Sequence, residues 1–294
     1  MFISNKALGA LVVSSILLQG CGSESSSNSP VTATAAVTCP SEQFVKFANN
    51  NYCSSTTAPE KIFILIDGTD GFPSGSKSWI KENIFNKTNI TWTEEGAEIS
   101  IAFLGDKPVA ELDVMHVCLP KHVSKINKLI DNVGSIKRGN NVLHCTVNET
   151  ADRFLNADSG AARSVLIEAV AEVFKNPKYR FGPTRPSSGV RKFYFISDLF
   201  QNSKTISFYK SCKTSANDGV ITCPSYESLI NNNARIERYL KEAMPDLNAT
   251  DEIYLYNINI ANRIDQSARA FWEQYFIAAG ALATNITYRA ELSQ

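Results

Sequence analysis

The sequence lacks several features on which common functions depend. Its 294 residues contain 29 basic and 29 acidic side chains, and this balance argues against nucleic acid or another polyanion as the main partner. No Cys-x-x-Cys is present, and the three histidines, His116, His122 and His144, are not at ligand spacing, so a zinc site has little support. There is also no Gly-x-Ser-x-Gly turn to indicate a hydrolase triad, and no internal repeat.

The N-terminus carries an apolar segment that is typical of an export signal. Residues 7–18 follow Lys6 and are too few to span a bilayer. They end in Leu18-Gln-Gly-Cys21, which resembles the lipobox of bacterial lipoproteins, whose cysteine is lipidated. We therefore expect a lipid anchor on Cys21 in a bacterial cell envelope, with an ordinary signal peptide and an accidental cysteine as the alternative. Gly22, where many lipoproteins of the inner membrane have aspartate, favours the outer membrane and leaves its periplasmic or external face open.

The rest of the chain predicts a tether followed by one domain. Residues 1–20 form the predicted signal peptide, and residues 21–37 are small and polar and form a lipidated, flexible tether. Residues 38–294 are enough for one α/β domain, with an insertion at about 118–158.

Six cysteines are left once Cys21 is assigned to lipid. An even number in an exported chain suggests three disulfides, for which 15 pairings are possible in principle. We expect each cysteine to pair with its neighbour in the sequence, because each bond then closes one of three successive segments of the chain. This pairing joins Cys39 with Cys53, Cys118 with Cys145, and Cys212 with Cys223.

The strongest structural signal is the apolar run at residues 62–66. It has no polar alternation, which is typical of a strand covered on both faces in a parallel sheet. The run stops at Asp67, Thr69 and Asp70, separated by glycines. Because ligands of such sheets bind beyond the carboxyl ends of the strands, these side chains mark a candidate site.

Strands and helices alternate along the remaining domain, which predicts a doubly wound, mostly parallel, Rossmann-like α/β sheet. Further strands are expected at 98–104 as an edge or hairpin partner, at 191–199, 252–260 and 286–292, and at 111–119 as a strand or a loop. Helices are expected at 42–48, around 79–84, and at 124–133, 158–176, 226–243 and 271–282. The helix at 124–133 has Ile126, Leu129, Ile130 and Val133 on one side.

Acid-bearing loops follow two of these strands, and a helix starts between them. The arrangement resembles the von Willebrand factor A domain, whose metal-ion-dependent adhesion site combines Asp-x-Ser/Thr-x-Ser, a hydroxyl at a helix start and a later aspartate. Asp67 and Thr69 match the first and third places of the first motif, and Gly71 stands where its last serine is expected. Ser164 matches the helix-start hydroxyl and Asp198 the later acid.

The resemblance implies a divalent-metal site that docks an acidic side chain of a partner protein. Mg²⁺ and Mn²⁺ prefer oxygen ligands of this kind. Gly71 removes one ligand, so that water or Asp70 would substitute, or the site is degenerate. The alternatives are that Asp67 and Asp198 only cap helix N-termini, or that the domain is a metal-independent scaffold of a secretion, conjugation or pilus machine.

Enzymatic alternatives have weaker motifs, and we expect no enzyme. Haloacid-dehalogenase-like phosphatases need Asp-x-Asp, and here the second acid comes one residue late, at Asp70. Alkaline-phosphatase-like enzymes put a nucleophile at the place of Thr69 but need several histidine and aspartate ligands downstream. The remaining enzymatic hypothesis is a metal-dependent phosphoesterase with Asp67 or Thr69 as nucleophile.

Two further clusters are expected to be structural. The basic residues of the loop at 175–192 are interpreted as a solvated face, with contact to phosphate or lipid head groups as the weaker alternative. Phe271, Trp272, Tyr275 and Phe276 have helical spacing and are expected in the core.

Overall fold

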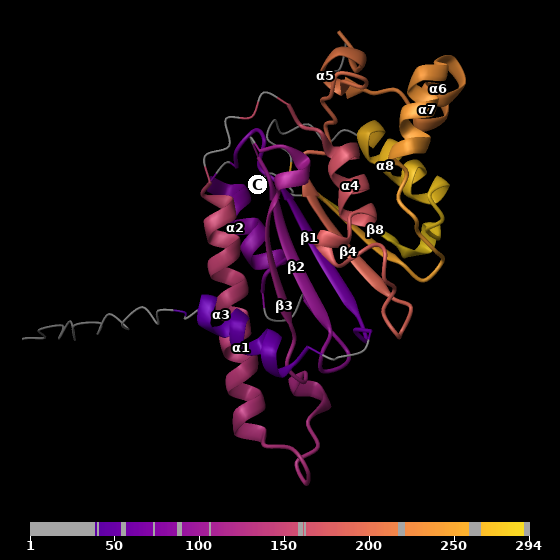
Figure 1. The fold of residues 1–294 in the computed structure, drawn as a ribbon. Helices are drawn as coiled ribbons and strands as arrows, with labels where there is room; N and C mark the ends of the chain where they lie inside the picture. Colours follow the sequence, from indigo (N-terminus) through magenta and orange to yellow (C-terminus); the bar gives the residue numbers. More distant parts are fainter. Residues whose placement is uncertain are drawn as a thin grey trace, which may run out of the picture. The chain divides into compact units, whose positions relative to one another are not determined.

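The protein is built around one six-stranded sheet. The computed structural model describes residues 39–290 except 40, 54–56, 73, 87–89, 106, 158–160, 162, 217–220 and 259–265. The sheet has the order β3-β2-β1-β4-β7-β8, and only the β2–β3 pair is antiparallel (Figure 1). Its strands are β1 (Lys61–Asp67), β2 (Glu98–Leu104), β3 (Asp113–Cys118), β4 (Arg191–Ser197), β7 (Glu252–Asn257) and β8 (Ile286–Ala290). The predicted α/β class with a mostly parallel sheet is confirmed.

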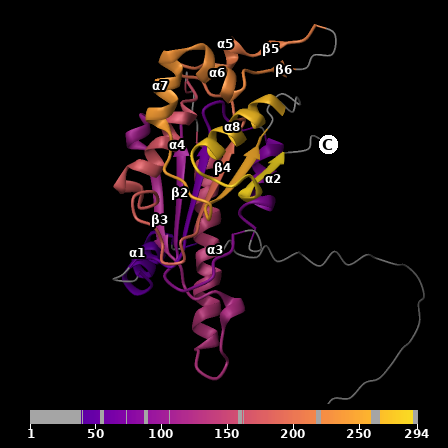
Figure 2. The same ribbon diagram turned by 90° about the vertical axis from the view of Figure 1, so that its right-hand side faces the viewer.

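Helices cover both faces of the sheet (Figures 1 and 2). One face carries α1 (Ser41–Asn51), α2 (Ser74–Asn83) and α3 (Val133–Leu155), and the other α4 (Leu166–Lys175), α6 (Tyr226–Asn232), α7 (Ala234–Ala243) and α8 (Gln266–Ala278). Beyond them lie the short α5 (Phe208–Ser211) and a small hairpin of β5 (Lys213–Thr214) and β6 (Ile221–Thr222). Within the described ranges, no helix is both long enough and apolar enough to cross a membrane.

The central strand β1 sends alternate side chains into two cores. Ile62, Ile64 and Ile66 pack against α1, α2 and α3, whereas Phe63 and Leu65 pack against the helices of the other face. Burial on both faces is the reason for the unbroken apolar run. The predicted aromatic cluster on α8 is confirmed as core, and its four rings are fully buried.

The insertion differs from its prediction. In place of a helix at 124–133 the chain forms a 3₁₀ turn at Val123–Lys125 and a loop, and α3 begins only at Val133. Here side-chain oxygens take the backbone N–H groups that a helix would use: the Asn127 N–H donates to Asp131 Oδ2, and the Leu129 N–H donates to Asn127 Oδ1. Such local bonds compete with helix formation. Of the expected apolar face, Leu129 and Ile130 are exposed, whereas Ile126 and Val133 are half-buried.

Other element boundaries also differ from the predictions. The helix expected at 226–243 is divided at Asn233, whose Oδ1 accepts from the N–H groups of Arg235 and Ile236 and starts α7. The helix expected at 158–176 begins only at Leu166. The strand β2 is a hairpin partner of β3 but not an edge, because its other side pairs with β1.

Two of the three predicted disulfides are wrong. The structure joins Cys39 to Cys145 and Cys53 to Cys118, and only the predicted bond of Cys212 with Cys223 is confirmed. The first two cysteines flank the 11-residue helix α1, which holds them about 16 Å apart, too far for one bond. Because α1 packs against both α3 and β3, each of these cysteines meets a different element.

A buried ion pair joins the starts of β4 and β7, which corrects the expectation that the basic loop is wholly solvated. Arg191 and Asp251 are each 1 % exposed, and Nε and Nη2 of Arg191 donate to the two carboxylate oxygens at 3.0 and 2.5 Å. Nη1 donates to the Gly182 carbonyl, and the guanidinium lies against the rings of Phe174 and Phe181. The buried guanidinium is therefore compensated by a carboxylate, a carbonyl oxygen and two aromatic rings.

Replacing Asp251 by alanine should destabilise the domain by about 3–5 kcal/mol, because it leaves the Arg191 charge buried without its partner. Urea unfolding followed by circular dichroism measures the loss. Asp246→Ala is the matched control, since that side chain is 92 % exposed, and it should change the free energy of unfolding by less than about 0.5 kcal/mol. Equal effects of the two substitutions would contradict the assignment.

Candidate functional site

Three loops meet at the carboxyl edge of the parallel strands. Asp67 is the last residue of β1, Ser164 lies two residues before α4, and Ser197 ends β4 with Asp198 directly after it. Asp67, Ser164 and Ser197 are buried. The prediction that the ends of β1 and β4 and the start of the helix between them approach one another agrees with this geometry.

The Asp67 carboxylate is the centre of the cluster. Its Oδ1 accepts from the Thr69 N–H at 3.1 Å and from Thr69 Oγ1 at 2.7 Å. Its Oδ2 accepts from Ser164 Oγ at 3.2 Å and from Ser197 Oγ at 2.7 Å. Asp67 itself is 6 % exposed, so these four donors take the place of water around a buried charge.

These bonds orient the hydroxyl groups. A hydroxyl has one hydrogen and two lone pairs, so a group that donates to Asp67 presents only lone pairs in other directions. Ser197 Oγ uses this capacity to accept from the Leu199 N–H at 2.8 Å. Thr69 and Ser164 are thereby left as oriented oxygen acceptors beside Asp67.

Asp198 adds a second carboxylate. Its Oδ1 accepts from the Phe200 N–H at 2.8 Å, which holds the side chain in a local turn. Burial, followed by the negative charge of Asp67, raises the pKa of Asp198 well above its usual range. Burial also raises the pKa of Asp67, against the hydrogen bonds from Ser197, Thr69 and Ser164. Two carboxyl groups thus share a site that disfavours a pair of negative charges.

No basic side chain compensates this site in the ranges that the structure describes. None of the ion pairs among the described residues includes Asp67, Asp70 or Asp198. The donor set is therefore all oxygen and acidic, which is the chemistry that a hard divalent cation fits.

Tyr209, which the sequence did not indicate, closes one side of the site. It projects from α5, and its hydroxyl lies 2.6 Å from Asp70 Oδ2 and 3.2 Å from Asp198 Oδ2. Burial and the charge of Asp198 raise its pKa, so the hydroxyl keeps its proton and acts as a donor. Ser197 was also missed, although its place at the end of a strand beside Asp198 was a usable signal.

Asp70 and Gly71 form the mouth of the site. Asp70 is exposed and accepts a hydrogen bond from the Tyr209 hydroxyl. Together with Asp67, Thr69 and Asp198 it lines a small depression. The depression is lined by Asp67, Thr69, Asp70, Gly71, Phe72, Asp198 and Ile258. Gly71 has a φ of +71°, so a serine at this position would be strained, which gives a physical reason for the missing ligand.

The helix-cap alternative has no support in the described part of the chain. The residue that precedes α4 is Val165, without a side-chain cap, and the N–H of Ile167 in its first turn donates to Gln201. The hydrogen bonds that Asp67 and Asp198 accept come from side-chain hydroxyls and from loop N–H groups. Cys21, the predicted lipidation site, lies outside the described residues.

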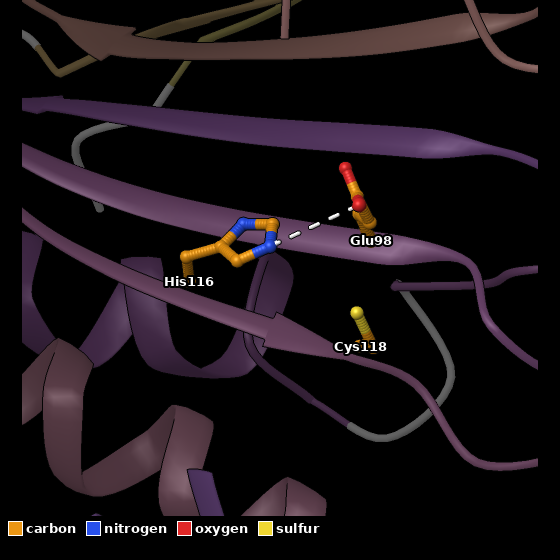
Figure 3. Close-up of side chains that lie close together, drawn as sticks. All are labelled: Glu98, His116 and Cys118. Atoms are coloured by element: carbon orange, nitrogen blue, oxygen red, sulfur yellow. Dashed lines mark ion pairs between the residues drawn. The ribbon is translucent and has the colours of Figure 1, made fainter. Parts of the chain in front are cut away.

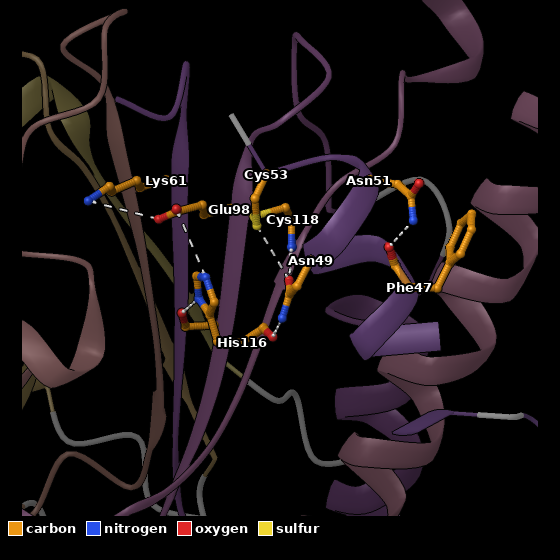
Figure 4. Close-up of a disulfide and its surroundings, with 9 residues drawn as sticks. Phe47, Asn49, Asn51, Cys53, Lys61, Glu98, His116 and Cys118 are labelled. Atoms are coloured by element: carbon orange, nitrogen blue, oxygen red, sulfur yellow. Dashed lines mark hydrogen bonds and ion pairs between the residues drawn. A yellow bond between two sulfur atoms is a disulfide. The ribbon is translucent and has the colours of Figure 1, made fainter. Parts of the chain in front are cut away.

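A second polar cluster lies on β2 and β3, where Glu98, His116 and Cys118 approach one another (Figure 3). Cys118 is bonded to Cys53, so its sulfur is not a thiolate ligand, and the Lys61 ammonium lies 3.9 Å from Glu98 (Figure 4). This combination argues against a cation site in the oxidised protein.

The role of this second cluster is structural. The Asn49 amide of α1 donates to the His116 carbonyl and accepts from the Cys118 N–H, which fixes α1 on β3 (Figure 4). Burial, followed by the charges of Arg180 and Lys61, lowers the pKa of His116 to about 4. The imidazole is therefore neutral at pH 7.

Acidification should destabilise the protein through His116. Its folded pKa of about 4 lies below the ordinary value of about 6.5, so between these values only the unfolded chain takes up the proton. His116 costs no stability above the ordinary value; as the pH falls below it the folded state is progressively destabilised, and the loss reaches about 3 kcal/mol below both values. Because other groups titrate too, the measurement is the difference between the parent and His116→Gln in urea unfolding at neutral and acidic pH. A difference that does not change with pH would contradict the buried, neutral state.

Comparisons with known proteins give only distant similarity. No protein-family model and no curated protein matches the sequence. Proximal thread matrix protein 1 from the mussel byssus matches 79 % of this chain and 44 % of its own, with 8 % identity and a TM-score of 0.35. The pilus adhesin SpaC from Lactobacillus rhamnosus GG matches 82 % of this chain and 29 % of its own, with 7 % identity and a TM-score of 0.31. The chain thus spans less than half the length of either structure, and these values assign it no function.

Proposed function

We propose that Asp67, Thr69, Ser164 and Asp198 bind a divalent cation, Mg²⁺ or Mn²⁺. The observation that carries this proposal is the direction of the hydroxyl groups. Thr69 and Ser164 donate their hydroxyl hydrogens to Asp67, so their oxygen lone pairs remain available as metal ligands. When bound, the cation would supply the positive charge that no lysine or arginine of the described residues provides there. Asp70, at the exposed mouth, is the substitute for the missing ligand at Gly71.

We further propose that the site docks a protein partner and does not catalyse a reaction. A bound cation that keeps an open position attracts a carboxylate from an acidic partner group. Asp67 is an unsuitable nucleophile, because it is 6 % exposed and both of its oxygens accept hydrogen bonds. The depression at the mouth is small, so that only one group of a partner could reach a bound cation there.

The proposed setting is the bacterial cell envelope. In this proposal, lipid on Cys21 holds the domain on a membrane through the tether at residues 21–37, and the outer membrane is favoured. The domain then acts as a binding or assembly module at the membrane surface.

A metal-independent scaffold is the second candidate, and one observation favours it. The buried Asp67 is already satisfied by four protein donors, and Gly71 supplies no ligand. Such a cluster can fix three loops without an ion, and binding would then use the faces of the fold.

Titration calorimetry with Mn²⁺ and Mg²⁺ distinguishes these candidates. The protein is residues 38–294, which contain the whole sheet, both cores and the three disulfides. We expect the parent to bind the ion and Asp198→Asn and Ser164→Ala to weaken binding about tenfold or more, since each removes or neutralises a ligand. Asp70→Asn changes the substitute ligand at the exposed mouth and should weaken binding less. Asp246→Asn, at a side chain that is 92 % exposed, is the control and should bind the ion as the parent does.

Glutarate serves as the carboxylate probe in a second titration. It should bind the Mn²⁺-loaded parent and lose binding when a chelator is added. Absence of metal-binding heat in all variants would overturn the metal proposal and favour the scaffold. Metal binding without glutarate binding would overturn the docking role alone.

A further inference from the structure

The chain between β3 and α3 forms a projection at the edge opposite the candidate site. Cys118 ends β3 and pairs with Glu98, the first residue of β2, so the chain leaves the sheet where the parallel strands begin. The 23-residue helix α3 then leads back along the sheet. Figures 1 and 2 show the start of α3 and the preceding loop extending beyond the strands. Residues 123–132 are called the tip loop below.

The tip loop exposes adjacent apolar side chains. Leu129 is 95 % exposed and Ile130 is 81 % exposed, which are the highest values among the large apolar side chains of the described residues. Val123 at the base of the loop is 43 % exposed. Exposure of neighbouring large apolar side chains is unfavourable in water and marks a surface that is covered by something else.

The loop is held in this conformation by its own polar groups. Asp131 accepts from the Asn127 N–H and from Lys121 Nζ, the latter at 2.7 Å. Asn127 in turn accepts from the N–H groups of Leu129 and Ile130, through its side chain and its carbonyl respectively. The two apolar side chains are therefore presented by an organised turn.

Basic side chains surround this turn. Residues 119–140 contain five basic residues and only one acid, Asp131, whereas the whole chain is balanced at 29 of each sign. Asp131 is paired with Lys121. The other four, Lys125, Lys128, Lys137 and Arg138, are exposed, and none forms an ion pair with another described residue.

We propose that the tip loop contacts an anionic lipid bilayer. Leu129 and Ile130 insert at the level of the head groups and first acyl carbons, while the four basic side chains contact lipid phosphates. Stable protein interfaces bury about 1,200–2,000 Å², and two side chains on a projecting turn offer far less. A bilayer needs no such area, and its negative surface complements the charge of the loop.

The inference does not depend on the metal site, and it agrees with the proposed lipid anchor. The 17 residues between Cys21 and Cys39 can span at most about 60 Å, and Cys39 is bonded to Cys145, about 18 Å along α3 from Val133. A lipid on Cys21 and the tip loop can therefore reach the same membrane. The candidate metal site, at the opposite edge, would then face away from that membrane.

Vesicle flotation of the non-lipidated residues 38–294 tests the proposal without the anchor. We expect binding to mixed phosphatidylcholine–phosphatidylglycerol vesicles, weaker binding to phosphatidylcholine alone, and release by salt. Leu129→Ser with Ile130→Ser should lower the affinity about tenfold or more. Lys125→Gln with Lys128→Gln should lower binding to the anionic vesicles selectively.

The matched control replaces two apolar side chains of intermediate exposure elsewhere. Ile277→Ser with Leu282→Ser, at residues 45 % and 49 % exposed, should change the affinity less than about twofold. Unfolding midpoints verify that each variant folds. Failure of the parent to bind, or equal binding by the Leu129/Ile130 variant, would overturn the proposal. So would a parent dimer in vesicle-free solution that this variant abolishes, because the tip loop would then be an interface between copies.

Discussion

The burial of one carboxylate constrains this structure most strongly. Because β1 is covered on both faces, Asp67 at its end is cut off from water and must find its hydrogen bonds within the protein. Thr69 comes from the same loop, whereas Ser164 and Ser197 come from far along the chain. Satisfying Asp67 therefore fixes three loops to one another, and it sets the direction in which their remaining lone pairs point.

The two ends of the domain have different chemistry. At the carboxyl edge of the strands lies an acidic group of oxygen atoms, and at the other edge lies an apolar turn with basic neighbours. The disulfides from Cys39 and Cys53 connect the two ends of α1 to α3 and β3, the elements that flank the tip loop. This difference agrees with the two proposals, a membrane contact at one end of the domain and a partner contact at the other.

Sequence reasoning succeeded where a single strong pattern decided the outcome. The apolar run before Asp67 predicted a central strand, and the acids at strand ends predicted which loops would meet. It failed where tertiary contacts or local hydrogen bonds determine the structure. No sequence pattern reveals that α1 packs against β3, or that the Asn127 side chain stabilises a turn in place of a helix. Tyr209 was missed for the same reason, since only the folded chain brings it to Asp198.

Anomalous scattering from Mn²⁺ is the most direct test of the central claim that Asp67 and its hydroxyl donors form a cation site. Crystals of residues 38–294 would be soaked in Mn²⁺, with Asp198→Asn crystals as the control. The account predicts an anomalous peak in contact with the oxygen atoms of Thr69, Ser164 and Asp67 or Asp198, and its loss or weakening in the variant. A well-ordered site without such a peak, with Asp67 hydrogen-bonded only to protein donors, would contradict it.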